Sequence, residues 1–243
     1  MPFFMIILVS IVQGITEFLP VSSSGHLVLL PIVTDQPYQG RTIDVAAHVG
    51  TLFAVMFFLR AEIIRIVIGL ASFGRHNRSD AQFGLMLIVA TIPVIGAGLY
   101  VNYADWHWLT MIETLAWSNL IFAVLLWGAD RYGVTIKNMN SMRFSSAILI
   151  GLSQICALLP GASRSGVTMT AARILGFDRI TAARFSLLLS LPTIAGAGIL
   201  KTRDLVNEGN LELGSDAALV ALFSGLKTEQ PEPRRFPVPD CLH

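Results

Sequence analysis

Long apolar runs alternate with short polar loops along most of this chain, a pattern that predicts a helical protein crossing a membrane several times. A helix needs roughly 20 apolar residues to span a bilayer, and several runs approach that length. Residues 63–73 are amphipathic, and we expect them to lie in the membrane interface. Residues 166–175 are too few to cross. The apolar helices that the pattern predicts cover residues 45–59, 83–101, 112–127, 144–159 and 182–200, and a further one begins at 215–226.

Two of the predicted helices contain a proline. Pro93 lies within residues 83–101, and Pro192 lies within residues 182–200. Proline has no backbone N–H and its ring clashes with the preceding helical turn. We therefore expect the first of these helices to be kinked or broken and the second to be broken.

Composition supports the membrane assignment. Of the 243 residues, 53% are hydrophobic and 14% are charged, with a mean hydropathy of +0.65, whereas soluble domains carry about 25% charged residues. The net charge of +1 gives no reason to expect a nucleic-acid partner. Cys156 and Cys241 make neither a disulfide framework nor a metal site, and the N-terminus lacks the features of a removed signal peptide. We expect one membrane domain over residues 1–226 and a polar, Pro-rich tail over 227–243.

The polar stretch QGITEFLPVSSSGH, residues 13–26, interrupts apolar sequence on both sides. Gln13 and Glu17 are four residues apart and share a helical face, and Pro20 ends that helix. The small residues 22–25 let backbone N–H groups and hydroxyls converge on an anion. Irregular backbone survives at membrane depth only where it lines a cavity, so we expect a broken, re-entrant element. The alternative is a surface loop between two ordinary helices.

A second polar stretch resembles the first. Residues 154–166, QICALLPGASRSG, again run from a glutamine through Leu-Pro to a serine-rich segment that ends in glycine. Residues 90–98 and 190–198 form another matching pair around a proline. Matching interrupted segments in two halves of a chain indicate a repeat whose elements meet at a membrane-buried site. The fold expected is therefore all-α, a polytopic transmembrane bundle with two re-entrant helix elements in inverted repeats.

Arginine-rich loops give the expected sidedness. The loops at 60–78 and 128–143 carry lysine and arginine, whereas the loop at 102–110 carries neither. The positive-inside rule places the first two loops in the cytoplasm. Counting helices from these loops, both polar stretches, 13–26 and 154–166, open toward the outer face.

Four arginines follow the second Leu-Pro, on what this count makes the outer side. A guanidinium clamps phosphate in bidentate fashion, and we expect that role for Arg164, which lies between two serines. For Arg173, Arg179 and Arg184 we favour side chains that reach from the helix to the membrane interface.

Together the two stretches supply a carboxylate, a histidine, serines and an arginine, which is a set suited to phosphoryl transfer from a membrane-borne substrate. An ionisable Glu17 or His26 in apolar surroundings indicates a functional site. The candidate residues are Gln13, Glu17, Ser22, Ser23, Ser24, Gly25 and His26 in the first stretch, and Ser163, Arg164, Ser165, Gly166 and Thr168 in the second.

Both motifs resemble the signatures of the undecaprenyl-diphosphate phosphatase family of the bacitracin-resistance type. The resemblance implies a hydrolase of the bacterial inner membrane that converts undecaprenyl diphosphate to undecaprenyl phosphate on the outer face, recycling the lipid carrier for cell-wall peptidoglycan synthesis. It implies catalytic roles for Glu17, Ser23, His26 and Arg164, with the other candidates binding substrate. It also implies a divalent cation, Mg²⁺ or Ca²⁺, for which Glu17 is the candidate ligand; Gln13 stands where the family has Glu or Gln.

Three points stay open at this stage. Ser23 is the expected nucleophile, and a metal-activated water is the mechanistic alternative. A polyprenyl-phosphate flippase or secondary transporter on the same repeated scaffold is the functional alternative. The expected partners are the lipid diphosphate and the membrane, with a homodimer left open.

The tail after residue 226 departs from the family, which ends with a full helix and one further span. We interpret this tail as a truncation or a change of reading frame.

Overall fold

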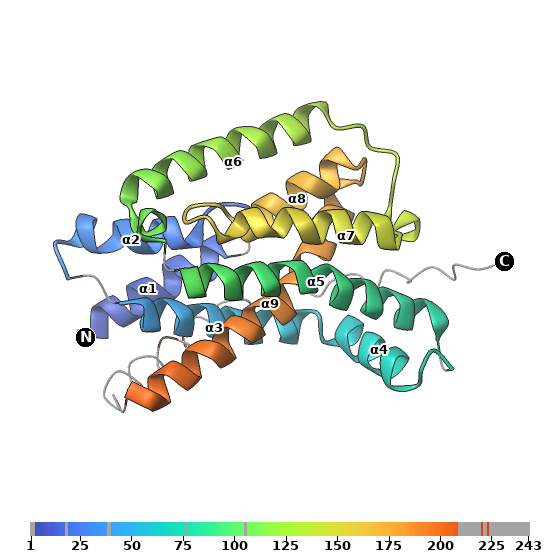
Figure 1. The fold of residues 1–243 in the computed structure, drawn as a ribbon, viewed down its shortest axis with the longest axis horizontal. Helices are drawn as coiled ribbons and strands as arrows, with labels where there is room; N and C mark the ends of the chain where they lie inside the picture. The colour runs from blue at the N-terminus through green and yellow to red at the C-terminus, as the bar shows by residue number, and fades with distance from the viewer. Residues whose placement is uncertain are drawn as a thin grey trace.

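The computed structural model describes residues 3–17, 19–37, 40–75, 77–104, 106–208, 220 and 223, and these are predominantly helical (Figure 1). Within these ranges the only β-type pairing is an isolated bridge between Lys137 and Phe177. The all-α prediction is therefore confirmed. The elements are α1 (Phe3–Thr16), α2 (Ser23–Thr34), α3 (Arg41–Phe58), α4 (Arg60–Ala71), α5 (Arg78–Ala104), η1 (His107–Thr110), α6 (Ile112–Tyr132), η2 (Met139–Ser141), α7 (Phe144–Ser153), η3 (Gln154–Leu158), α8 (Arg164–Ile174) and α9 (Arg179–Glu208).

Two helical hairpins dominate the arrangement. In the first, α1 runs to a turn and α2 returns beside it, so that the Thr34 hydroxyl donates to the Met5 sulfur at 3.8 Å. In the second, α7 and η3 run to a turn and α8 returns, so that the backbone N–H groups of Ile136 and Lys137 donate to the Gly176 carbonyl. The hairpins extend from opposite ends of the molecule, and their turns face each other (Figure 1).

The main apolar core packs the second hairpin against three long helices, α3, α5 and α9. Phe177 and Phe185 are fully buried in it, and Phe83 of α5 meets Phe185 edge-on. Gly151 of α7 lies so close to α5 that a Cβ there would approach the Ala90 carbonyl oxygen to 2.2 Å. This close contact fixes the position of the second hairpin along α5.

Three helices are long and apolar enough to cross a membrane among the residues that the structure describes: 78–101, 112–132 and 179–197. They cover three of the predicted spans. The helix expected at 144–159 is different, because its α-helical part ends at Ser153 and continues as the 3₁₀ helix η3. The helix expected at 45–59 is part of α3, and the short helix expected at 166–175 is α8.

The prolines at 93 and 192 do not end their helices, so the predicted break at Pro192 is wrong, and of the two outcomes expected at Pro93 the break is absent. Pro93 lies inside α5, and Pro192 lies inside α9, which continues to Glu208. Proline removes one backbone donor, but a long helix packed between others retains enough bonds to continue past it. Pro20 and Pro160, in contrast, lie in the turns between helices, as expected.

Arg173, Arg179 and Arg184 form ion pairs, and the burial of Arg173 contradicts the expectation that its side chain extends to an interface. For Arg179 and Arg184 that expectation stays a prediction. Arg173 is buried and contacts Asp130, and Arg179 makes a two-pronged contact with the same carboxylate. Arg184 pairs with Glu62. Glu62 belongs to the segment 60–78 and Asp130 to the segment 128–143, which are the two arginine-rich loops. The three arginines therefore lie at the same end of the molecule as these loops, and not at the opposite end.

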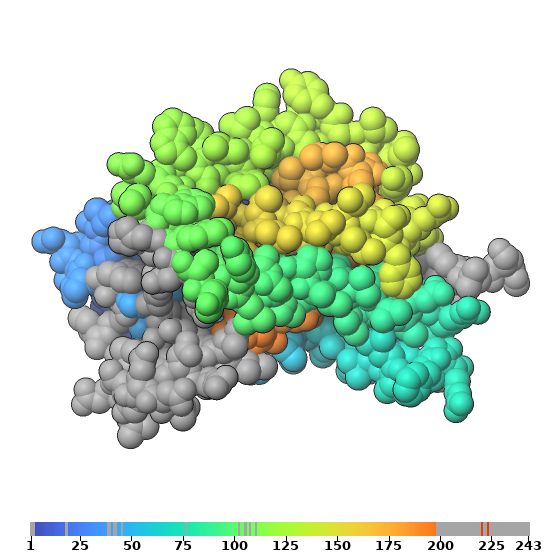
Figure 2. Space-filling view, viewed as in Figure 1, coloured from blue at the N-terminus to red at the C-terminus, as the bar shows by residue number. Residues whose placement is uncertain are grey.

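Helix α6 is the most exposed of the long helices, because its apolar side chains point outward along most of its length. In the space-filling view, α5, α6 and α7 form much of one face, with α8 visible between α6 and α7 (Figure 2). An exposed apolar helix is what a lipid-facing position requires.

Of the element expected at 215–226, the structure describes only Val220 and Phe223. Val220 is buried with Ile6 and Val9. The tail at 227–243 lies outside the described residues.

Candidate active site

A pocket of about 230 Å³ lies where the turns of the two hairpins meet. Elements far apart in the sequence contribute to it, namely both turns, α3, α5, η3 and α9. Its lining residues are Glu17, Val21, Ser22, Ser23, Ser24, His48, Val94, Gln154, Ala157, Leu158, Ala162, Ser163, Arg164, Ser165, Thr193 and Ala197.

The helix after each turn begins with the same capping arrangement. Ser22 is the N-cap of α2, and its hydroxyl accepts a hydrogen bond from the Gly25 N–H at 3.1 Å. Ser163 is the N-cap of α8, and its hydroxyl accepts from the Gly166 N–H at 3.2 Å. Serine is a favoured N-cap because its oxygen satisfies a backbone donor of the first turn. Each cap also bonds to the serine two residues on, at 3.1 Å in both cases.

The two turns are in direct contact. The Ser165 hydroxyl donates to the Leu19 carbonyl at 3.4 Å. A Cβ on Gly166 would approach the Pro20 carbonyl oxygen to 3.3 Å, and one on Gly161 would approach the Leu115 carbonyl oxygen of α6 to 2.2 Å. Gly161 also has a φ of +86°, so glycine serves there both for conformation and for space. The second turn is thereby held between the first turn and α6.

Glu17 is the centre of the polar network. Its Oε2 accepts from the Ser23 hydroxyl at 2.8 Å and from Gln13 Nε2 at 3.0 Å, and its Oε1 accepts from Arg164 Nη2 at 3.1 Å. Glu17 directly follows α1 and lies outside the three long apolar helices. Burial by itself would raise the pKa of its carboxyl. His48 and Arg164, with the hydrogen bonds from Ser23 and Gln13, outweigh burial and hold the pKa below its usual value. Glu17 is therefore ionised at neutral pH.

His48 of α3 completes this group. Its Nδ1 lies 2.7 Å from the Asp44 carbonyl oxygen, which can only accept, so Nδ1 carries a proton. Its Nε2 then faces the group, 3.4 Å from Glu17 Oε2 and 3.4 Å from the Ser23 hydroxyl. His48 lies within the apolar helix predicted at 45–59, and no motif in the sequence gave it a role. The signal that could have found it is the one used for Glu17, an ionisable residue within apolar sequence.

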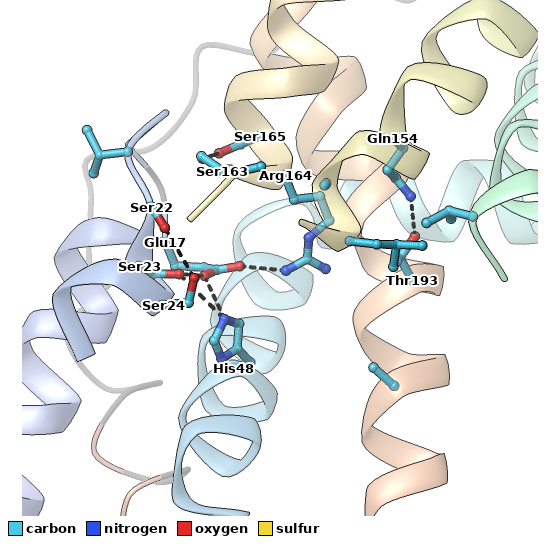
Figure 3. A pocket seen from close by; sticks show the side chains of 16 residues that line it. Glu17, Ser22, Ser23, Ser24, His48, Gln154, Ser163, Arg164, Ser165 and Thr193 are labelled. Atoms are coloured by element: carbon cyan, nitrogen blue, oxygen red, sulfur yellow. Dashed lines mark hydrogen bonds and ion pairs between the residues drawn. The ribbon is translucent and has the colours of Figure 1, made fainter. Parts of the chain in front are cut away.

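Arg164 divides the pocket into two parts (Figure 3). On one side lie Glu17, the serines of the first turn and His48. On the other side lie Gln154 and Thr193, where Gln154 Nε2 donates to the Thr193 hydroxyl at 2.8 Å. Gln154 was notable in the sequence only as part of the repeat, and Thr193 belonged to no candidate motif. Their approach depends on how η3 packs against α9, which local motifs do not encode.

The structure brings seven of the predicted residues to the pocket and leaves five outside its lining. His26 is exposed, and its Nδ1 lies 2.7 Å from the Ser22 carbonyl oxygen. Thr168 is buried between α8 and α9, where its hydroxyl contacts Ser186. Gln13 is fully buried behind Glu17. The residues lining the pocket are Glu17, Ser22, Ser23, Ser24, Ser163, Arg164 and Ser165; those outside the lining are Gln13, Gly25, His26, Gly166 and Thr168.

The geometry can support nucleophilic chemistry on an anionic substrate. A serine hydroxyl is bonded to an ionised carboxylate, with a guanidinium bonded to the other carboxylate oxygen. Among the described residues no group of three or more His, Cys, Asp or Glu side chains could hold a metal by itself. A cation here would need oxygen ligands from the substrate as well.

Comparison with known proteins gives one consistent result. The family model described as bacitracin resistance protein BacA matches residues 6–228. A protein of Ruegeria pomeroyi is 43% identical over 227 residues, which cover 92% of this chain and 85% of that protein. A protein of Roseobacter denitrificans is 42% identical with the same coverage, and one of Alcanivorax borkumensis is 43% identical over 210 residues, covering 86% and 79%. All three relatives are named undecaprenyl-diphosphatase. A match over nearly the whole chain at this identity shows that the protein belongs to the BacA bacitracin-resistance family.

Proposed function

We propose that this protein removes the terminal phosphate of undecaprenyl diphosphate and releases undecaprenyl phosphate and inorganic phosphate. The name shared by its relatives supports this activity. The observation that carries it is the bonded set of Ser23, Glu17 and Arg164 in one pocket. The reaction supplies the monophosphate carrier that cell-wall synthesis consumes, which is the recycling role implied by the family.

The first step of the proposed reaction is attack by Ser23. Its hydroxyl proton passes to Glu17 Oε2, the nearest base at 2.8 Å, as Oγ bonds to the terminal phosphorus. The bond from that phosphorus to the bridging oxygen breaks, and the bridging oxygen leaves on the lipid monophosphate. Arg164 braces the phosphate charge. His48, at 3.4 Å, orients the pair instead of acting as the primary base.

His26 is the proposed proton donor to the leaving oxygen. Its Nδ1 is held by the Ser22 carbonyl at the first turn of α2, and its ring is otherwise exposed. A second step regenerates the serine, when water attacks the phosphoserine and the Ser23 oxygen takes back a proton. Direct attack by an activated water, with Ser23 as a phosphate ligand only, is the mechanistic alternative.

A divalent cation fits the residues on the Glu17 side of the pocket. The Glu17 carboxylate and the Gln13 Oε1 would hold it, since Gln13 Oε1 is buried and has no hydrogen-bond partner among the described residues. Mg²⁺ commonly takes one or two protein oxygens and completes its shell with substrate phosphates and water. When bound, it would neutralise charge on the diphosphate.

We place the protein in the bacterial inner membrane, with both hairpins as re-entrant elements of inverted repeats. Each hairpin begins and ends on one side of the molecule, and their turns meet between the ends. The arginines at 173, 179 and 184 add to the positive charge near the loops at 60–78 and 128–143, which supports a cytoplasmic position for that end. The pocket then opens toward the outer face.

Phosphate release from undecaprenyl diphosphate by the purified protein tests the activity. The expected result is stoichiometric release of inorganic phosphate that depends on a divalent cation and is lost on chelation. Binding of the lipid without release would favour a flippase or transporter instead.

Thiol labelling of intact cells tests the sidedness. In a background where Cys156 and Cys241 are replaced by serine, Ser24→Cys should react with a membrane-impermeant reagent added outside. Asn77→Cys, in the loop at the other end, should react only after permeabilisation. The reverse pattern would overturn the orientation.

A further inference from the structure

The part of the pocket beyond Arg164 has polar groups to which the proposed reaction assigns no role. Gln154 is fully buried, yet it lines the pocket, and one end of its amide has no hydrogen-bond partner among the described residues. The other end donates to Thr193, which is half-buried on the pocket wall. Buried amides are normally satisfied at both ends, so an unmatched end beside a cavity indicates a missing ligand.

The Gln154–Thr193 contact makes Thr193 a hydrogen-bond donor. Because Gln154 Nε2 donates to Thr193 Oγ1, the hydroxyl proton of Thr193 must point elsewhere. Its partner within α9 is the Leu189 carbonyl oxygen at 3.2 Å, a long bond to an oxygen within a helix. The proton can therefore turn to a stronger acceptor, and an anionic oxygen in the pocket is one.

The Gln154 amide can adapt to the same ligand. Its oxygen and nitrogen are interchangeable by rotation, and Thr193 can donate to the oxygen as readily as it accepts from the nitrogen. Rotation would leave the two N–H groups unmatched, and these are donors for an anion. In the rotated orientation the anion is bound by the amide N–H groups, with Thr193 donating to the amide oxygen; in the other orientation the Thr193 hydroxyl is the donor and the free amide oxygen can only accept.

The surroundings of this part of the pocket differ from those of the Ser23 part. Gln154 and Thr193 belong to η3 and α9, and the other lining residues from these elements are apolar: Ala157, Leu158 and Ala197. The Ser23 part is lined mainly by serines and charged side chains. A pocket of about 230 Å³ is smaller than typical ligand sites of about 300–1,000 Å³, which suits a head group with its chain leaving over an apolar wall.

We propose that Thr193 and Gln154 form a second phosphate subsite, which binds the phosphate that stays on the lipid, while Ser23 and Arg164 bind the phosphate that is removed. Arg164 lies between the two subsites (Figure 3). One of its terminal nitrogens is bonded to Glu17, and the rest of the guanidinium fork can bridge the two phosphates. The subsite rests on the proposed function, and it makes the lipid monophosphate a ligand in its own right.

Equilibrium binding to the purified, detergent-solubilised protein tests the subsite without turnover. The probes are farnesyl monophosphate, which fits the second subsite, and inorganic phosphate, which fits the first. In Thr193→Val, which keeps the shape and removes the hydroxyl, the Kd of farnesyl monophosphate should rise about tenfold, since hydrogen bonds to charged groups are the stronger kind. The Kd of inorganic phosphate should stay unchanged. Thr193→Ser, which retains the hydroxyl, should bind farnesyl monophosphate as the unmodified protein does.

A negative charge introduced at position 154 gives an independent test. Gln154→Glu should weaken farnesyl monophosphate binding more than Gln154→Leu does, because a carboxylate repels the phosphate. Thr91→Val is the matched control, since Thr91 is a buried threonine of α5 that bonds to the Leu87 carbonyl and does not line the pocket. It should leave both binding constants unchanged.

Three results would overturn the subsite. The first is no binding of farnesyl monophosphate by the unmodified protein, and the second is an equal loss of both ligands in Thr193→Val. The third is unchanged or tighter monophosphate binding in Gln154→Glu. That result would mean that the side chain at position 154 accepts a hydrogen bond or binds a cation at its pocket end. If the unmodified protein binds the monophosphate but releases no phosphate from the diphosphate, the proposed function fails while the subsite stands.

Discussion

The first turns of α2 and α8 are built alike and carry different chemistry. In both, a serine N-cap accepts from the N–H of a glycine three residues on and bonds to the serine two residues on. The residue after the cap is Ser23 in α2 and Arg164 in α8. Equivalent positions of one backbone motif therefore present a serine, the proposed nucleophile, from one side of the pocket and an arginine, the proposed phosphate ligand, from the other.

The support behind the two turns also differs. Ser23 is bonded to Glu17, with His48 at 3.4 Å, so the first turn has ionisable partners for proton transfer. Besides the contact of Arg164 with Glu17, the second hairpin has ionic contacts at the far end of α8, where Arg173 and Arg179 meet Asp130. Two turns with the same caps therefore have different neighbours, and the pocket between them is asymmetric.

Replacing Arg164 should have the largest effect among the residues that support Ser23. Arg164→Lys retains the charge but loses the planar fork that bonds Glu17 and braces phosphate. We expect the rate of phosphate release to fall about 10³-fold, as for loss of an oriented donor in other enzymes. Arg179→Lys is the control, because Arg179 is exposed and pairs with Asp130, and it should stay within about twofold. Near-normal turnover of Arg164→Lys would remove Arg164 from the site.

His26 should have the next largest effect. It occupies the position in α2 that Val167, a buried apolar residue, occupies in α8, so the two hairpins differ here as well. His26→Asn keeps a polar side chain but cannot donate a proton to the leaving oxygen, and kcat should fall about 10²-fold. Steady-state kinetics on undecaprenyl diphosphate measure this. An unchanged kcat would show that His26, which is exposed, lies away from the reacting atoms and is not the proton donor.

His48 should have a smaller effect that depends on the substitute. His48→Leu leaves Ser23 and Glu17 without this neighbour, and kcat should fall about tenfold. His48→Gln can still hydrogen-bond, and activity should stay within about threefold, because Glu17 and not His48 is the proposed base. Since His48 lowers the pKa of Glu17, the acid limb of the pH–rate profile should move to higher pH in His48→Leu. An acid limb at its original pH would show that His48 does not act on Glu17.

Thr168 should affect stability alone. Its hydroxyl is enclosed between α8 and α9 and bonds to Ser186 and the Arg164 carbonyl. Thr168→Val removes these bonds with little change of shape and should lower the free energy of unfolding by about 1 kcal/mol. Thermal unfolding in detergent measures the loss, with phosphate release within about twofold. A large loss of activity in a stable Thr168→Val protein would restore Thr168 as a substrate ligand.

Local sequence was sufficient to predict the two turns, because a proline followed by a serine- and glycine-rich run both ends a helix and caps the next. The same reasoning failed at Pro192 and gives no break at Pro93, because apolar sequence continues at both positions and packing keeps the helix intact. His48, Gln154 and Thr193 reach the pocket only through the packing of α3, η3 and α9 around the turns. No motif spacing within one segment records such contacts.

The sequence also misplaced the arginines at the end of α8 and just beyond it. Counting spans along the chain treated residues 144–159 as a full crossing, which put Arg173 and Arg179 on the outer side. The structure shows a hairpin that returns, and the two arginines meet Asp130 near the loop from which the hairpin began. A hairpin and a crossing have similar hydropathy, and only tertiary contacts separate them.

Ser23→Ala tests the central claim most directly, that the two turns form one active site with Ser23 as nucleophile. Phosphate release from undecaprenyl diphosphate should fall by about 10³-fold or more, while lipid binding and folding remain intact. Ser22→Ala and Ser24→Ala should be much milder, because the Ser22 hydroxyl caps α2 and the Ser24 hydroxyl bonds to it. If Ser23→Ala kept a tenth of the activity, the serine would be only a phosphate ligand, and an activated water would be the nucleophile.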